Sequence, residues 1–126
     1  MSQELEPLTW RVTREQITDY AEASGDHNPI HLDEDAARAA GLPGVIAHGM
    51  LGMAQLANFV VAYAGDHRRL RRLRCRFAGM ILPGDTITFT GHVAGEEAGL
   101  IRLELEAANQ KGERVLTKAL AEVAAA

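Results

Sequence analysis

The 126-residue sequence contains one cysteine and few aromatic residues, and both shortages limit what kind of protein it can be. A single thiol, Cys75, cannot form an internal disulfide, so the cysteine content gives no sign of an oxidising compartment. Aromatic side chains make up 5% of the chain, so aliphatic and alanine side chains must fill the interior. The start of the chain is polar and acidic, unlike a secretory signal, and no apolar run is as long as a membrane span. We therefore expect a soluble, cytoplasmic protein with one domain over residues 1–126.

The net charge of −4 at pH 7 conceals one strongly basic segment. Nearly half of the 13 basic residues are arginines that lie between positions 68 and 76, namely Arg68, Arg69, Arg71, Arg72, Arg74 and Arg76. In the second part of this segment arginines alternate with apolar residues, which predicts a strand with one arginine face and one apolar face. The rest of the chain is acidic, so we expect a local contact site for anions and not a general polyanion binder.

Capping signals and hydrophobic periodicity predict helices in the first half of the chain and strands in the second half. Thr13 and Gln16 form a capping box that starts a helix, and Gly25 ends it. Residues 49–64 are apolar on nearly every helical face, which predicts a buried helix that the rest of the chain wraps. Further elements are expected as a strand at 8–12, a short helix at 33–40, and strands at 72–77, 86–93, 100–107 and 114–123. A buried helix followed by antiparallel strands gives an α+β fold with the sheet curled around the helix.

The most informative motif is the segment 24–31, Ser-Gly-Asp-His-Asn-Pro-Ile-His, followed by His48-Gly49 at the start of the apolar helix. Gly25 and Pro29 keep the segment between Asp26 and His31 out of a helix. A carboxylate and an imidazole can exchange protons with a substrate, and the first N–H groups of a helix have no acceptor within it. The region therefore offers an acid/base pair beside donors for a developing negative charge.

These residues resemble the hydratase motif of the MaoC-like dehydratases, the family of (R)-specific enoyl-CoA hydratases and (3R)-hydroxyacyl-ACP dehydratase subunits. The resemblance runs over Tyr20, Ser24-Gly25-Asp26, Asn28-Pro29, His31-Leu32-Asp33, Ala36, Gly41 and Ile46-Ala47-His48-Gly49-Met50-Leu51, and continues at Phe77 and Pro83-Gly84-Asp85. It implies a single hot-dog fold, in which a curved antiparallel sheet wraps around a long central helix. It also implies a dimer, either with a second copy or with a related subunit.

The implied activity is a hydro-lyase reaction, the reversible hydration of trans-2-enoyl thioesters to (3R)-3-hydroxyacyl thioesters of CoA or acyl carrier protein (ACP). Asp26 and His31 would hold the catalytic water, and the backbone N–H of Gly49 would bind the thioester carbonyl. Asn28, His48 and Met50 are expected to position the loop or the substrate. No cofactor is implied. The chain departs from the family pattern at two positions, at His27, which is often aromatic or aliphatic, and at Ala57, where some members carry serine.

Other interpretations of the same residues stay open at this stage. Asp26 alone is a common turn residue at a helix end. His27, His31 and His48 are potential metal ligands, but Pro29 disfavours the helix that would align the first two, and no fourth ligand is evident. We therefore expect no metal. As alternative functions, the chain is the catalytic subunit of a heterodimeric dehydratase that is inactive alone, or a thioesterase, because a fold does not fix a function.

The arginine face also has more than one interpretation. Charged side chains on a strand are most simply a solvated face that deters edge aggregation. Alternatively, Arg72, Arg74 and Arg76 contact the phosphates of CoA or the acidic surface of ACP. Nucleic acid is a weaker candidate, because no aromatic residues lie between the arginines and the rest of the chain is acidic. We expect neither nucleic-acid nor membrane binding.

Overall fold

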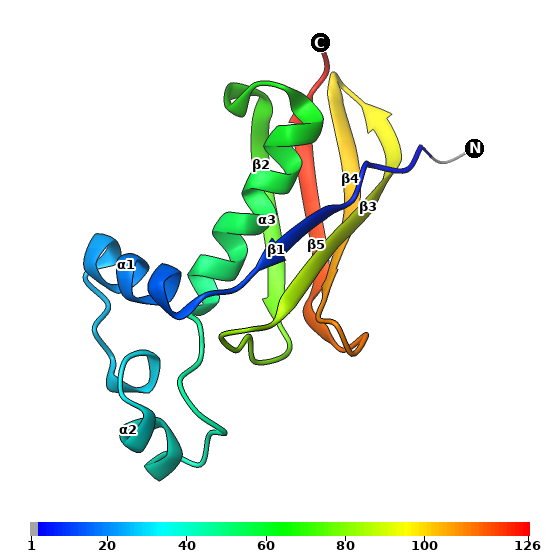
Figure 1. Ribbon diagram of the computed structural model, residues 1–126. Coiled ribbons are helices and arrows are strands. Elements are labelled where there is room, and N and C mark those ends of the chain that lie inside the picture. The colour runs from blue at the N-terminus through cyan, green and yellow to red at the C-terminus, as the bar shows by residue number, and fades with distance from the viewer. Residues whose placement is uncertain (1–2) are drawn as a thin grey trace.

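Five antiparallel strands form one sheet in the computed structural model, which describes residues 3–126 (Figure 1). The strands lie in the order β1-β3-β4-β5-β2, so β1 and β2 are the two edges. Their bounds are β1 Leu8–Arg11, β2 Leu70–Phe77, β3 Thr86–Glu97, β4 Leu100–Ala108 and β5 Arg114–Ala124. The α-helices are α1 Arg14–Ser24, α2 Glu34–Ala39 and α3 Gly49–Ala64, with short 3-10 helices at Pro29–His31 (η1) and His67–Arg69 (η2). The expected hot-dog arrangement is confirmed.

The core lies between α3 and the inner face of the sheet. Leu56, Phe59 and Val60 of α3 are buried together with Phe89 of β3 and Leu103 of β4. The rings of Phe59 and Phe89 stack with their centroids 6.0 Å apart. This packing fixes the axis of α3 against the sheet, and α1 and α2 lie beyond the N-terminal end of the helix (Figure 1).

One face of α3 differs from the prediction that the helix is buried all round. Met50, Ala54, Asn58 and Ala62 are exposed at intervals of four residues, which is one turn of a helix. A single sheet curls around only one side of a helix, so the opposite face stays uncovered. None of the helices in residues 3–126 is both long enough and apolar enough to cross a membrane.

Local signals place α1 as the sequence predicted. The side chain of Thr13 accepts a hydrogen bond from the Gln16 N–H (3.1 Å), and the Gln16 side chain accepts one from the Thr13 N–H (3.2 Å). Gly25 ends the helix with a left-handed φ of 78°, which glycine adopts at little cost. The loop predicted from Asp26 to His31 contains one element not foreseen, the 3-10 turn that begins at Pro29.

The Pro83-Gly84-Asp85 turn before β3 supports the segment that leads into the N-terminal end of α3. Asp85 is buried, and its carboxylate accepts hydrogen bonds from the Leu82 N–H (2.9 Å) and the Gln110 amide (3.0 Å). The same turn is joined to the segment that leads into α3, because the Ala47 N–H donates to the Ile81 carbonyl (2.8 Å). Within this structure the motif is therefore a brace for α3 and does not line the candidate site.

The β3–β4 turn gives a first prediction. Ala98 and Gly99 both have positive φ (54° and 80°), as a two-residue hairpin of the Asn-Gly type requires. Because a left-handed conformation costs a non-glycine residue about 1 kcal/mol, Ala98→Asn should raise the free energy of unfolding by about 0.5–1 kcal/mol. Urea denaturation measures this, and Gly99→Ala should lower the same free energy. An Ala98→Asn variant less stable than the parent would contradict the assigned turn.

Candidate active site

The loop that carries Asp26 is held by its own side chains. The Ser24 hydroxyl accepts a hydrogen bond from the Asp26 N–H (3.1 Å), and one oxygen of Asp26 accepts from the Asn28 N–H (3.2 Å). The Asn28 side chain in turn accepts from the Ile30 N–H (3.2 Å). Each oxygen thus binds the N–H two residues on, as Asx and ST turns do. One carboxylate oxygen of Asp26 takes part in these loop hydrogen bonds, and the other carboxylate oxygen does not.

The hydrogen bond of His31 determines which of its nitrogens can accept a proton. Nδ1 lies 2.7 Å from the carbonyl oxygen of Ile46, and a carbonyl only accepts hydrogen bonds. Nδ1 therefore carries the hydrogen in the neutral ring, which leaves the lone pair on Nε2. His31 is 9% exposed, so the Ile46 contact holds a largely buried ring in one orientation.

His48 connects the other parts of the site. Its Nε2 lies 3.0 Å from the backbone carbonyl of Asp26 and so donates to it. Its ring stacks on that of His31 with the centroids 3.8 Å apart, and the ring of Tyr20 lies at 4.8 Å on a tilted plane. His48 is 2% exposed, and within residues 3–126 its Nδ1 has no hydrogen-bond partner. These contacts assign it to positioning and not to proton transfer.

The N-terminal end of α3 begins directly after His48. His48 is the N-cap of the helix but makes no side-chain capping bond, and Gly49 is the first helical residue. The initial N–H groups have no acceptor inside the helix, and they lie at the positive end of its dipole. A Cβ at position 49 would lie 3.3 Å from the ring of Phe77, so glycine keeps the space beside this N–H clear.

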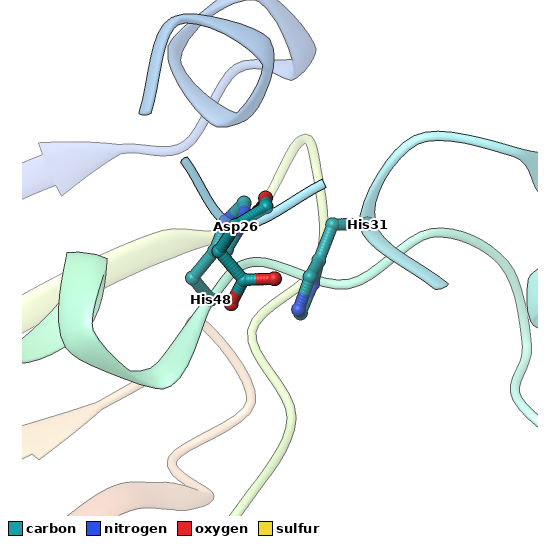
Figure 2. Close-up of side chains that lie close together, drawn as sticks. All are labelled: Asp26, His31 and His48. Carbon is teal, nitrogen blue, oxygen red and sulfur yellow. Dashed lines mark hydrogen bonds between the residues drawn. The ribbon is translucent and has the colours of Figure 1, made fainter. Parts of the chain in front are cut away.

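These elements surround one pocket of about 440 Å³. Figure 2 shows that the side chains of Asp26, His31 and His48 converge from separate segments of the chain. The pocket is lined by Tyr20, Ser24, Asp26, His31, His48, Gly49, Met50 and Phe77. The structure thus brings together five of the residues that were selected from the sequence. Four of them are Asp26, His31, His48 and Gly49, and the fifth is Met50, which is exposed at the mouth of the pocket.

Three lining residues had no role in the sequence analysis, although each belongs to the motif. Tyr20 and Ser24 reach the pocket from the last turns of α1, and Phe77 reaches it from the end of β2. Asn28 does not line the pocket and acts through the loop backbone. His27 points elsewhere, because its Nε2 lies 3.2 Å from the Glu22 carboxylate and its side chain is exposed.

The arginine face lies on the opposite side of the sheet from the pocket. Arg72 and Arg74 stand opposite Glu122 and Leu120 on β5, whereas Leu73 stands opposite Ala121, which is fully buried against the core. Cys75 shares the apolar face as expected, and its partial burial raises the pKa of its thiol, which favours the protonated form. A contact between the arginines and phosphate or a carrier protein stays a prediction.

Asp26, His31 and His48 each offer one potential metal-ligating atom, and these atoms all lie within 4.8 Å of one another. The hydrogen bonds described above leave His31 only Nε2 and His48 only the buried Nδ1 as lone-pair donors. The spacing fits a shared water as readily as an ion. The expectation of no metal therefore stays a prediction.

Comparison with known proteins identifies the family. Residues 2–113 match the family described as MaoC like domain, so the chain belongs to the MaoC-like dehydratases. The hydro-lyase class expected from the sequence is confirmed at the level of the family.

Curated relatives are much longer proteins. The chain is 40% identical over 100 residues to the fatty acid synthase beta subunit TOXC of Cochliobolus carbonum, with 77% of this chain and 5% of that protein covered. It is 35% identical over 100 residues to fatty acid synthase subunit beta of Saccharomyces cerevisiae, with 78% of this chain and 5% of that protein covered. The chain thus spans about one twentieth of these relatives.

Solved structures share the fold over the whole chain. A MaoC-like dehydratase superposes with a TM-score of 0.94 at 32% identity, covering 100% of this chain and 40% of that one. The (R)-hydratase from A. caviae involved in PHA biosynthesis gives a TM-score of 0.88 at 22% identity, with 99% of this chain and 96% of that chain covered. The ChsH1-ChsH2 complex from Mycobacterium tuberculosis also gives a TM-score of 0.88, at 24% identity, with 99% of this chain and 97% of that chain covered.

The role of His48 gives a second prediction. His48→Leu removes the donor to the Asp26 carbonyl, and the loss of one hydrogen bond of about 1–1.5 kcal/mol should speed local opening about tenfold. Hydrogen-exchange mass spectrometry of the segment 24–32 measures this opening. His48→Gln is the matched control, because its amide nitrogen reaches the place of Nε2 and should preserve protection. Equal exchange in all three proteins would show that the hydrogen bond does not hold the loop.

Proposed function

We propose that this chain catalyses the reversible hydration of trans-2-enoyl thioesters to (3R)-3-hydroxyacyl thioesters. The observation that carries the proposal is the convergence of Asp26 and His31 beside the free N-terminal end of α3 in one pocket. Membership in the MaoC-like family supports hydration and dehydration as the reaction class. The names of the curated relatives support a fatty acyl thioester as substrate.

The spacing of Asp26 and His31 suits a bound water. Two hydrogen bonds of about 2.8 Å that meet at one water span up to about 5.5 Å, which accommodates ligand atoms within 4.8 Å of one another. The free Asp26 oxygen accepts one hydrogen of this water, and Nε2 of His31 accepts the other. The water oxygen keeps a lone pair to attack a carbon atom in the pocket.

Hydration then follows with balanced protons and electrons. The water oxygen bonds to Cβ of the enoyl group while one O–H bond breaks and its proton moves to Nε2 of His31. The electron pair of the C=C bond moves to Cα and the thioester oxygen. Cα then takes the proton back from His31, which completes the addition of one water. The Ile46 carbonyl and the Asp26 carboxylate stabilise the transient imidazolium.

The N–H of Gly49 suits the negative charge that develops on the thioester oxygen. It opens a helix of 16 residues, so the helix dipole adds to the hydrogen bond. Such a donor typically contributes about 3 kcal/mol to transition-state stabilisation. The half-exposed side chains of Met50 and Phe77 add apolar lining to the pocket, as an acyl thioester requires.

The assay for this proposal is the loss of the enoyl absorbance of crotonyl-CoA and longer enoyl-CoA substrates. Asp26→Asn and His31→Ala each remove one partner of the water, and each should lower kcat by about 100- to 10,000-fold. Asp19→Asn is the matched control, because Asp19 is an exposed carboxylate on α1 that does not line the pocket. Circular dichroism of all three variants should match the parent protein.

Two results would contradict the proposal. Undiminished turnover in both Asp26→Asn and His31→Ala would remove the pair from the reaction. Release of free thiol from an acyl-CoA without hydration would instead identify the chain as a thioesterase. If the parent protein is inactive alone but becomes active with a related subunit, the chain is the catalytic subunit of a heterodimer, and the two substitutions must abolish that restored activity.

A further inference from the structure

His27 does not line the pocket, but both nitrogens of its ring contact groups beside the loop that carries Asp26. Nδ1 lies 3.3 Å from the carbonyl oxygen of Gly25, and Nε2 lies 3.2 Å from a carboxylate oxygen of Glu22. A carbonyl and an ionised carboxylate have no hydrogen to donate, so both oxygens can only accept hydrogen bonds. The ring therefore makes both bonds only when both nitrogens carry hydrogen, that is, as the imidazolium ion.

The contact with Gly25 bears on the orientation of Asp26. The Gly25 carbonyl and the Asp26 N–H belong to one planar peptide group. The N–H of this group donates to the Ser24 hydroxyl at 3.1 Å, and its carbonyl faces the ring of His27. The next carbonyl along the chain, that of Asp26 itself, accepts from His48 at 3.0 Å. The backbone is thus held on both sides of the Asp26 Cα, and His27 holds the side that leads into it.

The charged groups around His27 favour a positive ring. Glu22 is the one carboxylate within 4.0 Å of the ring nitrogens among residues 3–126. The last turn of α1 has no basic residue, so a protonated His27 places a positive charge at the negative end of the helix dipole. Asp26 turns one carboxylate oxygen to the backbone N–H two residues on, and the rings of His31 and His48 bond to backbone carbonyls.

A neutral His27 cannot hold the Gly25 carbonyl in the same way. The charged Glu22 carboxylate is the stronger of the two acceptors, so the single ring hydrogen goes to Nε2. Nδ1 then turns a lone pair toward the Gly25 carbonyl oxygen, and the two repel each other. A histidine side chain changes its charge between about pH 5 and 8. The contact with the loop therefore weakens as the pH rises through this range, whereas the contact with α1 stays.

We propose that His27 is a positioning residue whose protonated ring holds the peptide group between Gly25 and Asp26 against α1 and so orients the Asp26 carboxylate in the pocket. The ring touches neither the water nor the substrate and acts through the backbone of the loop. The inference rests on the proposed hydration, in which Asp26 holds a water beside His31. It gives the reaction a dependence on pH in addition to that of the proton transfer at His31.

The substitution His27→Phe tests this role, because it keeps an aromatic ring and removes both donors. At about pH 6 we expect kcat for an enoyl-CoA to be about threefold lower than in the parent protein with KM unchanged, and at about pH 8.5 we expect equal kcat values. The ratio of the two kcat values removes the titration of His31, which both proteins share. His67→Phe is the matched control, because His67 is an exposed histidine 3.9 Å from the Asp66 carboxylate and does not line the pocket. It should leave kcat unchanged at both pH values.

Glu22→Gln changes the same contact in the opposite direction. The new amide can donate to Nε2, so a neutral His27 can direct its hydrogen from Nδ1 to the Gly25 carbonyl. We expect this variant to have a kcat about threefold higher than the parent protein at about pH 8.5.

Hydrogen exchange of the segment 24–32 gives a measurement that does not depend on the reaction. Exchange should be about threefold faster in His27→Phe than in the parent protein at about pH 6, because the loop opens more often without the ring contact. At about pH 8.5 the two proteins should exchange equally. Circular dichroism confirms that the variants are folded.

Two outcomes would overturn the proposal. Equal kcat and equal exchange in the parent protein and His27→Phe at both pH values would show that the ring does not hold the loop. A lower kcat with the same ratio at both pH values would assign the effect to the shape of the ring and not to its charge. If no protein hydrates an enoyl-CoA, the proposed function fails, and the exchange measurements alone decide whether His27 holds the loop.

Discussion

The packing of α3 against the inner face of the sheet is the constraint on which the rest of the molecule depends. Leu56, Phe59 and Val60 bury one side of the helix, so its axis and its N-terminal end are fixed relative to β3 and β4. A helix end has free N–H groups wherever it lies. It becomes a useful site only when other groups are held beside it, and the fixed axis makes that possible here.

His48 converts this fixed helix end into an organised site. As the N-cap it belongs to α3, and its side chain reaches the Asp26 carbonyl and the ring of His31. One imidazole therefore sets the position of the acid/base pair relative to the N–H of Gly49. The buried Nδ1, which has no hydrogen-bond partner among residues 3–126, is the cost of this arrangement, about 1–3 kcal/mol for an unsatisfied polar atom. Sites that hold such groups in a strained or unsatisfied state are often functional.

The parts of the fold that the sequence predicted are those determined by signals within a few neighbouring residues. The Thr13–Gln16 capping box and Gly25 act over a few residues, so the bounds of α1 followed directly. Alternation likewise located β4 and β5. The exposed face of α3 was not predictable, because an apolar helix has the same pattern whether its own sheet or another chain covers it.

Contacts between distant segments explain what could not be predicted in the site. Asp26, His31 and Gly49 were selected because their residue types and order carry the chemistry. The bond from His48 to the Asp26 carbonyl joins residues 22 positions apart, and Phe77 reaches the pocket from a strand beyond α3. Backbone carbonyls leave no mark in a sequence, so the tautomers of His31 and His48 required the structure.

The central claim is that Asp26 and His31 hold a water above Cβ while the N–H of Gly49 binds the thioester oxygen. A crystal structure of Asp26→Asn with crotonyl-CoA bound tests it most directly, because the slow variant preserves the substrate. The account predicts the thioester oxygen within hydrogen-bonding distance of the Gly49 nitrogen, and Cβ beside a water bound to His31 Nε2. A thioester oxygen that points away from α3, with Cβ outside the reach of His31, would contradict it.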